Sequence, residues 1–458
     1  MSQAAEVLAK TREAVGKRTN YRWVVMVLIF IIYTIAMADR ANLGVALPFI
    51  KKEFRMTNTD AGALVSLLFF FYAIFQIPAG FLYKKLTVRK VFPISMILTS
   101  VFTGLMGMTG SLLMLKVFRA GLGLAESPTG IGCTSTINRW FPSKEKGTAT
   151  GIWLAASKFG PVLCPPLGVL IIESFGWRYI FYFFAIPGII FSILWLLLVT
   201  NKPSESRFVS PAELEYIQTE QAPSAAKGKA TVPRKQYSLA WLDKLILAKR
   251  VKQLETSAQV FRSWNIYGNT IGYGCMIGVS NVMLAWIPTY LMNVKHFTSM
   301  KMGFLASAPF VGAVLGNLLG GVVSDWLLNK RRKPLMLVSA FCTVLTMYAL
   351  VYAPNSAAYL GFMLFMTGLL LALGYSAFAV YPMGVTTKET YPVAFGIINS
   401  GGQLGGALTP LAVGMILDRY NWNSVFLFLA LCSVLCLVVL ATLDEPLDDA
   451  MVPATALR

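Results

Sequence analysis

Charged residues are scarce in this sequence, and their scarcity excludes an ordinary soluble domain. Only 13% of the 458 residues are Asp, Glu, Lys or Arg, against about a quarter in a typical globular protein. The mean hydropathy is +0.62, and 56% of the residues are hydrophobic. Apolar blocks of roughly 20 residues, the length that crosses the hydrocarbon core of a bilayer, recur along nearly the whole chain. We therefore expect an all-α integral membrane protein.

Histidine and several motifs are also scarce or missing. The one histidine, His296, lies in a short connection between apolar blocks, which excludes a histidine-based catalytic or metal cluster within one chain. The six cysteines lie in or beside apolar segments and lack metal-ligand spacing. No G-x-x-x-x-G-K-[ST] run occurs, so an ATP-driven pump is not expected. We expect no enzyme activity, no cofactor and no bound metal.

Basic residues outnumber acidic ones, and the formal net charge is +19. They fall between the apolar blocks and form no patch with interleaved aromatic residues, so we expect no nucleic-acid partner. Lys and Arg gather in the N-terminal tail, in residues 83–90 and 138–147, in the long polar stretch after residue 200, and in 329–333. The positive-inside rule then places both termini in the cytoplasm, and we expect a protein of the inner (cytoplasmic) membrane.

Breaks at polar residues, glycine and proline divide the apolar blocks into twelve predicted membrane-spanning helices, six in each half of the chain. The spans lie near residues 22–49, 60–83, 90–110, 112–137, 147–173 and 177–200, and then near 262–291, 301–328, 334–353, 356–383, 391–418 and 423–442. The predicted organisation is a cytoplasmic tail at 1–21, a six-helix half at 22–200, a cytoplasmic linker at 201–261, a second six-helix half at 262–442 and a cytoplasmic tail at 443–458. Within the linker, a short helix is expected at 211–221.

The two halves look like repeats of one unit. Residues 151–177 align with 396–422 without a gap and match at seven positions, among them Pro165 with Pro410 and the tryptophan that ends each stretch. Internal repeats of this kind are typical of secondary transporters. Lys158 and Gln403 occupy equivalent positions in this alignment, so only the first half carries a charge there.

Five ionisable residues lie within predicted spans: Asp39, Arg40, Arg119, Glu126 and Lys158. Each costs about 2.5 to 3.5 kcal/mol on membrane-insertion scales, so each is a functional hypothesis by default. Neighbouring residues of a helix point about 100° apart, so Asp39 and Arg40 must each find a partner elsewhere. The alternatives are structural. Asp39 and Arg40 could form interhelical ion pairs, Arg119 and Glu126 could pin span four, and Lys158 could pair permanently with Asp39 or Glu126.

Among these residues, Glu126 suits proton binding and Lys158 suits anion binding. Arg119 and Glu126 are seven residues apart, two turns along one helix face. Glu126 lies near the middle of its span, which favours it as a proton carrier. Lys158 lies eleven residues into span five and is a natural counter-charge for a carboxylate substrate.

Four motifs carry a family resemblance. They are the run from Ala38 to Leu43 (ADRANL), Tyr72 followed by Gln76-Ile77-Pro78, the R-x-x-x-G-x-x-E-x-P pattern from Arg119 to Pro128, and Trp140-Phe141-Pro142. Together they resemble the anion:cation symporter branch of the major facilitator superfamily, and the resemblance covers essentially the full chain. That branch includes bacterial galactonate, glucarate, tartrate and phthalate permeases and the animal sialic-acid and vesicular glutamate carriers.

The resemblance implies roles for individual residues. Asp39 and Glu126 resemble the protonation pair of the family, and Arg119 would modulate Glu126. Arg40 and Tyr72 resemble substrate-binding positions. The implied activity is proton-coupled uptake of a small organic anion by a carrier that we expect to be monomeric in the lipid bilayer.

Other positions match the family only partly. Ser376 and Asn399 match positions that line the sugar-acid site of relatives, but Ala379 stands where those relatives have an aromatic residue. Ser157 replaces a substrate-binding glutamine and precedes the unusual Lys158. These departures argue against a galactonate-like substrate. We expect a dicarboxylate, an aromatic acid or a sugar acid, with Arg40 and Lys158 binding opposite ends of it.

The superfamily's cytoplasmic loop signature, G-x-x-x-D-R-x-G-R-R, is present unevenly. The second half keeps its aspartate as Asp325, whereas the first half has Lys84 at that position. One of the two charge clasps that would stabilise the outward-open state is therefore predicted to be missing or rebuilt.

Other functions remain open from the residues alone. A multidrug or metabolite exporter of the same fold would usually rely on an acidic, aromatic cavity for cations, which three buried cations do not favour. A channel would need a continuous polar lining, and a membrane sensor would need a signalling domain larger than the linker.

Overall fold

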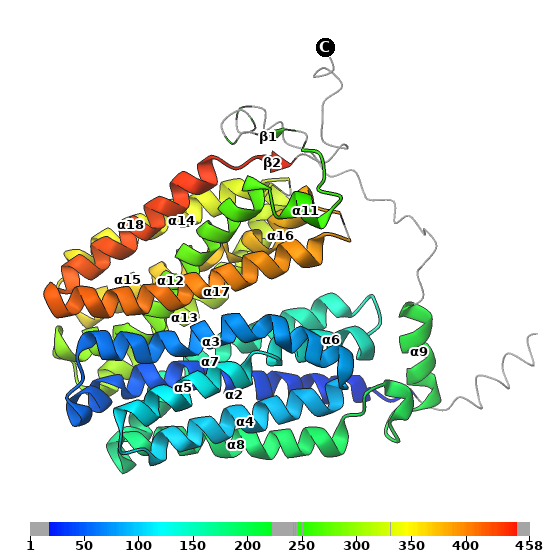
Figure 1. The fold of residues 1–458 in the computed structure, drawn as a ribbon, viewed down its shortest axis with the longest axis horizontal. Helices are drawn as coiled ribbons and strands as arrows, with labels where there is room; N and C mark the ends of the chain where they lie inside the picture. Colours follow the sequence, from blue (N-terminus) through cyan, green and yellow to red (C-terminus); the bar gives the residue numbers. More distant parts are fainter. Residues whose placement is uncertain are drawn as a thin grey trace, which may run out of the picture.

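The computed structural model describes residues 18–221, 241, 243, 246, 248–249, 251–329, 331–387 and 389–446. The described chain is almost entirely helical, and its long helices run roughly side by side in two stacked layers (Figure 1). Residues before the linker form one layer and residues after it form the other. The all-α prediction is confirmed, apart from one pair of two-residue strands.

The helices of the N-terminal half follow the predicted spans closely. They are α2 (Tyr21–Phe54), α3 (Asn58–Lys85), α4 (Val88–Met108), α5 (Leu112–Glu126), α6 (Thr129–Trp140), α7 (Lys146–Phe175) and α8 (Trp177–Leu198).

The C-terminal half repeats this arrangement. Its helices are α12 (Trp264–Asn293), α13 (Ser299–Val322) with the π-helical turn η2 (Val323–Leu327), α14 (Lys333–Val351), α15 (Ala357–Leu373), α16 (Tyr375–Val385), α17 (Tyr391–Arg419) and α18 (Trp422–Ala441).

Within the described residues, ten spans are long and apolar enough to cross a membrane. The other two predicted spans are the fourth, which is split into α5 and α6, and the eleventh, which is α17. Large apolar side chains on the outer face of α8 are exposed, for example Ile186 at 56% and Leu197 at 69%. Contiguous exposed apolar surface of this kind is expected where helices face lipid. The chain is a multi-pass membrane protein.

Two helices are broken in mid-span, one in each half. The first break separates α5 from α6 at Ser127 and Pro128, and proline cannot continue the hydrogen-bonding pattern because it lacks an N–H. The second break, at Gly374, separates α15 from α16. A Cβ on Gly374 would lie 2.8 Å from the Cβ of Ser339 on α14, so glycine is needed for this close approach. Neither break was predicted, because the spans predicted at 112–137 and 356–383 are each uninterrupted.

The two halves meet through small residues. Gly44 on α2 packs against the backbone of Ala285 on α12, and Gly62 on α3 packs against the backbone of Pro410 on α17. Glycines let helix backbones approach closely, as in other membrane proteins. At the end of the bundle near these contacts, the Asp418 carboxylate of α17 accepts hydrogen bonds from the backbone N–H groups of Asn58 and Thr59, each at 2.8 Å. We call this the far end.

The opposite end, which we call the linker end, holds the residues between the halves. These include η1 (Pro203–Glu205), α9 (Pro211–Gln221), β1 (Ala248–Lys249) and α11 (Ser257–Val260). The short helix expected at 211–221 is present as α9. After α18, β2 (Glu445–Pro446) pairs with β1 in parallel.

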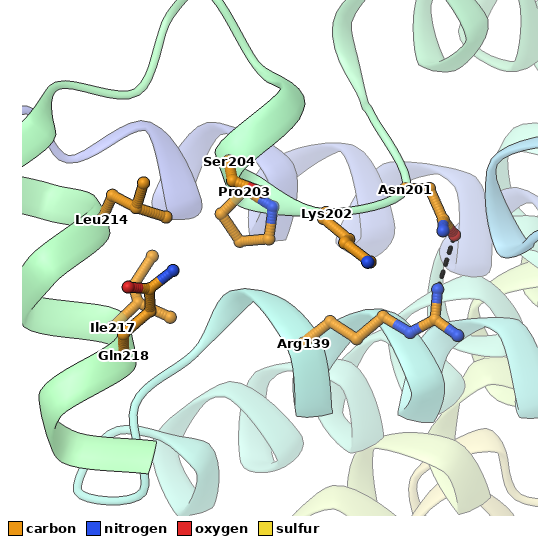
Figure 2. Close-up of a pocket in the computed structure, with 8 residues that line it drawn as sticks. All are labelled: Arg139, Asn201, Lys202, Pro203, Ser204, Leu214, Ile217 and Gln218. Carbon is orange, nitrogen blue, oxygen red and sulfur yellow. Dashed lines mark hydrogen bonds between the residues drawn. The ribbon is translucent and has the colours of Figure 1, made fainter. Parts of the chain in front are cut away.

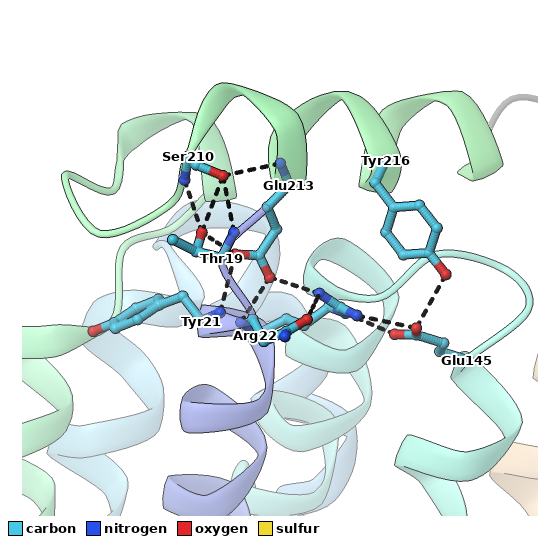
Figure 3. Close-up of polar contacts among 8 residues, drawn as sticks. Thr19, Tyr21, Arg22, Glu145, Ser210, Glu213 and Tyr216 are labelled. Carbon is cyan, nitrogen blue, oxygen red and sulfur yellow. Dashed lines mark hydrogen bonds and ion pairs between the residues drawn. The ribbon is translucent and has the colours of Figure 1, made fainter. Parts of the chain in front are cut away.

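The first part of the linker is fixed to the N-terminal half. Glu213 of α9 is fully buried, and its carboxylate accepts hydrogen bonds from the backbone N–H groups of Tyr21 (3.0 Å) and Arg22 (3.2 Å) at the start of α2. The Arg22 guanidinium, also buried, forms ion pairs with Glu213 at 2.9 Å and Glu145 at 2.7 Å (Figure 3). Tyr216 donates to the same Glu145.

The later part of the linker is fixed to the C-terminal half. Asp243 forms an ion pair with Arg331, and the backbone N–H of Leu254 donates to the carbonyl of Val385 at 2.9 Å. The linker therefore divides between the two halves instead of forming a unit of its own.

A cavity of about 370 Å³ lies at the linker end of the N-terminal half (Figure 2). It is lined by Arg139, Asn201, Lys202, Pro203, Ser204, Leu214, Ile217 and Gln218. These residues come from the end of α6, the segment after α8, and α9, and none of them is a predicted site residue. This cavity is therefore separate from the mid-span charges.

Candidate functional site

A buried ion pair joins two of the predicted site residues. Arg40 of α2 donates from Nε to Oε1 of Glu126 at 2.7 Å, and Glu126 is the last residue of α5, next to the break in span four. Glu126 is fully buried, and the Arg40 side chain is 14% exposed. The other carboxylate oxygen, Oε2, has no hydrogen-bond partner among the described residues. A buried carboxylate that is only half satisfied is costly when charged and cheaper when protonated.

Aromatic rings of α3 surround the cation of this pair. The guanidinium carbon of Arg40 lies 4.6 Å from the centroid of the Tyr72 ring and 5.8 Å from that of Phe69. Stacking on a ring stabilises a guanidinium without neutralising it. The structure thus brings Arg40, Tyr72 and Glu126 together, whereas Phe69 was not among the predicted site residues.

Arg119 contacts the backbone of α2 at Asp39 and Arg40. Asp39 and Arg119 are both buried, and Arg119 donates to the backbone carbonyls of Asp39 at 3.2 Å and Arg40 at 3.4 Å. Its described hydrogen bonds therefore do not reach the Glu126 carboxylate. Asp39 accepts a hydrogen bond from Asn42 at 3.2 Å through Oδ1, while its Oδ2 has no hydrogen-bond partner among the described residues.

Lys158 of α7 is half-buried and points toward the C-terminal half. Its ammonium nitrogen lies 5.2 Å from the centroid of the Tyr375 ring on α16. The described ion pairs join Lys158 to neither Asp39 nor Glu126, which disfavours the permanent ion pair considered from the sequence. The Lys158 side chain is a cation held by an aromatic ring.

The remaining predicted substrate-binding residues are Ser157, Ser376 and Asn399. Ser157 donates to the backbone carbonyl of Leu154 at 2.6 Å. Ser376 directly follows Tyr375 on α16, Asn399 lies on α17, and both are half-buried. These positions are compatible with a site between the halves.

The C-terminal half contributes aromatic residues that sequence reasoning missed. Tyr375 packs edge-on against Tyr273 of α12, with ring centroids 5.8 Å apart, and Tyr273 packs against Phe378 at 5.6 Å. In the sequence these are aromatic residues in apolar spans, like many others. Gly374, which precedes Tyr375, was the one feature of the sequence that could have indicated this aromatic cluster.

The side chains of Lys84 and Asp325, on which the predicted charge clasps depend, lie outside the described parts of the structure. Their backbones belong to the last turn of α3 and to η2. In the part of the chain that is described, no group of three or more His, Cys, Asp or Glu residues could hold a metal ion.

Comparison with known proteins identifies similar sequences along nearly the full length. The sequence model of the Major Facilitator Superfamily matches residues 29–384 and 302–456. A probable galactarate/D-glucarate transporter of Escherichia coli K12 is 28% identical over 456 residues, which cover 94% of this chain and 96% of that protein. A D-galactonate transporter of Escherichia coli O6:H1 is 27% identical, over 92% of this chain and 95% of that protein. A probable sulfoacetate transporter of Cupriavidus necator is 25% identical, over 88% and 89%.

Solved structures give the same fold. A bacterial homolog of the human lysosomal transporter Spinster, in an inward-facing and occupied conformation, superposes with a TM-score of 0.70, covering 93% of this chain and 96% of that one. A D-xylose-proton symporter superposes with a TM-score of 0.69, over 92% and 97%. Their sequence identities, 16% and 14%, limit this likeness to the fold.

Proposed function

This chain belongs to the Major Facilitator Superfamily and is a transporter, and from that premise we propose that it takes up a small organic dianion together with protons. In a bacterial cell it is a protein of the inner membrane. The observation that carries the proposal is the buried pair of Arg40 and Glu126, in which the Glu126 carboxylate and a substrate carboxylate would compete for the same guanidinium.

The coupling step follows from the geometry of this pair. While Glu126 is charged, it occupies Arg40 at 2.7 Å. A proton on Glu126 removes that charge and releases the guanidinium, whose planar fork suits both oxygens of a substrate carboxylate. Because the protonated carboxyl is the cheaper form in a buried site, substrate binding favours proton uptake. This linkage of two binding events is what symport requires.

Asp39 is the second proton site in this proposal. It is fully buried, and one of its oxygens has no hydrogen-bond partner in the described structure. Arg119 donates to the backbone carbonyls of the same α2 turn, so a positive charge lies beside the backbone of Asp39 and Arg40. A proton on Asp39 would lower the cost of burying this group while the carrier changes conformation.

The choice of a dianion rests on two separate cations. Arg40 binds one carboxylate, and Lys158, held by the Tyr375 ring, is available to a second anionic group. The relatives named for galactarate and D-glucarate support this choice, because both compounds carry a carboxylate at each end. Tyr72, Ser157, Ser376 and Asn399 are proposed to supply hydrogen bonds between the two ends.

Alternating access would use the contacts between the halves. Asp418 joins the halves at the far end, and opening that end requires these hydrogen bonds to break. We place the substrate between the halves, between the far end and the linker end, where Arg40 and Lys158 lie.

The test is transport by Glu126→Gln in proteoliposomes. The variant should abolish galactarate accumulation driven by a pH gradient but keep exchange of labelled for unlabelled galactarate, because glutamine mimics the protonated carboxyl. Glu173→Gln, at an exposed acidic residue near the end of α7, is the matched control. Normal accumulation by Glu126→Gln would disprove the coupling role.

A further inference from the structure

The contact between Lys158 and Tyr375 crosses the boundary between the two halves. Lys158 belongs to α7 in the N-terminal half, and Tyr375 is the first residue of α16 in the C-terminal half. The ammonium lies over the ring face, 5.2 Å from the centroid. The second cation of the proposed site is therefore positioned by a residue of the opposite half.

Tyr375 is itself held firmly. Its hydroxyl donates to the backbone carbonyl of Met276 at 3.4 Å, and Tyr273 packs edge-on against its ring. Tyr273 in turn contacts the fully buried Phe378. Gly374, directly before the ring, allows a close approach to Ser339 that a Cβ would obstruct. These contacts make the ring an aromatic platform for the Lys158 ammonium.

A ring positioned by such contacts suits a lysine that has to bind an anion. The lysine stem has four flexible carbons, so a free ammonium would lose much conformational entropy on binding. A cation–π contact fixes the ammonium in place without neutralising it, and its N–H groups away from the ring remain able to donate. An acidic partner would instead neutralise the charge of the ammonium, as Glu126 does for Arg40.

The two cations of the site are thus held in related ways but differ in availability. Arg40 lies over Tyr72 and is also ion-paired, so a proton controls its release. Lys158 lies over Tyr375, and the described ion pairs do not include it. A monoanion needs only the first cation, whereas a dianion needs both.

We propose that Tyr375 is a specificity-determining residue that positions the Lys158 ammonium for the distal anionic group of a dianionic substrate. This inference rests on the proposed function and deepens it. The C-terminal half thereby selects for dianions through a cation that belongs to the N-terminal half.

The test compares galactarate, a dianion, with galactonate, a monoanion, as inhibitors and as substrates of exchange in proteoliposomes. Tyr375→Leu should raise the KM for galactarate about tenfold and leave the KM for galactonate within about twofold. Tyr375→Phe, which keeps the ring, should retain wild-type discrimination. Tyr375→Met is a second variant that also removes the ring, and it replaces Tyr375→Leu if the leucine variant folds poorly. Tyr359→Leu, at an exposed tyrosine of the neighbouring α15, is the matched control.

A double-variant cycle separates positioning from packing. In a Lys158→Gln background, Tyr375→Leu should have no further effect on galactarate, because there is no ammonium left to position. Equal losses for both acids, or additive losses in the cycle, would overturn the inference and make Tyr375 a packing residue.

Different results would exclude the two-cation site and the role of Tyr375. If Lys158→Gln itself leaves the preference for galactarate intact, the two-cation site of the proposed function is wrong. If Lys158→Gln removes the preference but Tyr375→Leu and Tyr375→Met do not, only the role of Tyr375 is wrong.

Discussion

The two halves of this carrier share an architecture and divide the chemistry. Each has a mid-span break, between α5 and α6 in the first half and between α15 and α16 in the second. Beside the first break lies a buried ion pair, Arg40 with Glu126, and beside the second lies an aromatic platform built on Tyr375. The repeat preserves the break in the backbone, while the side chains beside it differ: charged residues in the first half and aromatic residues in the second.

The aligned pair of Lys158 and Gln403 shows the same division. Lys158 carries a charge that reaches the opposite half, and Gln403 carries an amide whose oxygen has no hydrogen-bond partner among the described residues. A polar group at this position is common to both halves, but the charge is found in one.

The largest expected effect comes from removing the cation of the N-terminal pair. Arg40→Gln leaves Glu126 buried without its partner, which typically costs about 3 to 5 kcal/mol. We expect a clear fall in melting temperature and loss of transport. Glu126→Gln added to Arg40→Gln should recover most of the stability but not the transport. Failure of the double variant to recover stability would show that the pair is not the main role of Arg40 in folding.

A second prediction moves the charge between the halves. Lys158→Gln should weaken galactarate binding by about two orders of magnitude and galactonate binding much less, since only the dianion uses both cations. Adding Gln403→Lys should not restore galactarate binding, because the new lysine would lack the Tyr375 platform. Full recovery in the Lys158→Gln/Gln403→Lys variant would show that the halves are interchangeable here. Equilibrium binding in detergent measures both acids.

Two carboxylates at the linker end, Glu445 and Glu145, have pKa values shifted in opposite directions. Burial raises the pKa of Glu445 to about 7, although its carboxylate accepts backbone hydrogen bonds from Arg332 and Lys333. The hydrogen bond from Arg22 lowers the pKa of Glu145 below its usual value.

These shifts have opposite consequences for stability. The folded state binds the Glu445 proton more tightly than the unfolded chain, so this contribution falls as pH rises from about 4.5 to 7, by at most about 1.4 kcal/mol per pH unit. The Glu145 contribution is present above its unfolded pKa and is lost as pH falls through the lower folded pKa. Glu445→Gln should flatten the melting-temperature profile between pH 5 and 7, and Glu145→Gln should not. An unchanged profile in Glu445→Gln would contradict the assignment.

The smallest expected effect concerns the contact that closes the far end. Asp418→Asn weakens charge-assisted hydrogen bonds to the start of α3 and should shift the balance of conformations about tenfold toward opening at that end. A cysteine at Ala379, in a background without the six native cysteines, should then react faster with a reagent supplied from the far end. Asp60→Asn is the control, because Asp60 pairs with Lys116 inside one half. Equal labelling of the Asp418 and Asp60 variants would show that the Asp418 hydrogen bonds do not hold the far end closed.

Much of the fold could be predicted from hydropathy, because a bilayer requires long apolar helices. The breaks could be predicted only in part. Pro128 was visible inside span four, but Gly374 was one of many glycines, and only its contact with Ser339 gives it a structural role.

The site was harder to predict than the fold. The sequence indicates that Arg40 needs a partner on another helix, and the structure supplies Glu126, 86 residues away. Which buried charges pair depends on how each helix is rotated and packed, which local patterns do not specify. The same limit hid the contact of Arg119 with the α2 carbonyls and the platform under Lys158. The division of the linker between the halves depends on Glu213 and Asp243, which look like ordinary surface acids in the sequence.

The central claim is that the Glu126 carboxylate and the substrate carboxylate compete for Arg40, so that a proton on Glu126 favours substrate binding. Its most direct test is proton uptake by the purified carrier on galactarate binding, followed with a pH indicator in weakly buffered detergent solution. The account predicts uptake by the wild type and by Glu173→Gln, with about one proton fewer per bound galactarate in Glu126→Gln. Galactarate binding without proton uptake in the wild type, or the same uptake in Glu126→Gln, would contradict it.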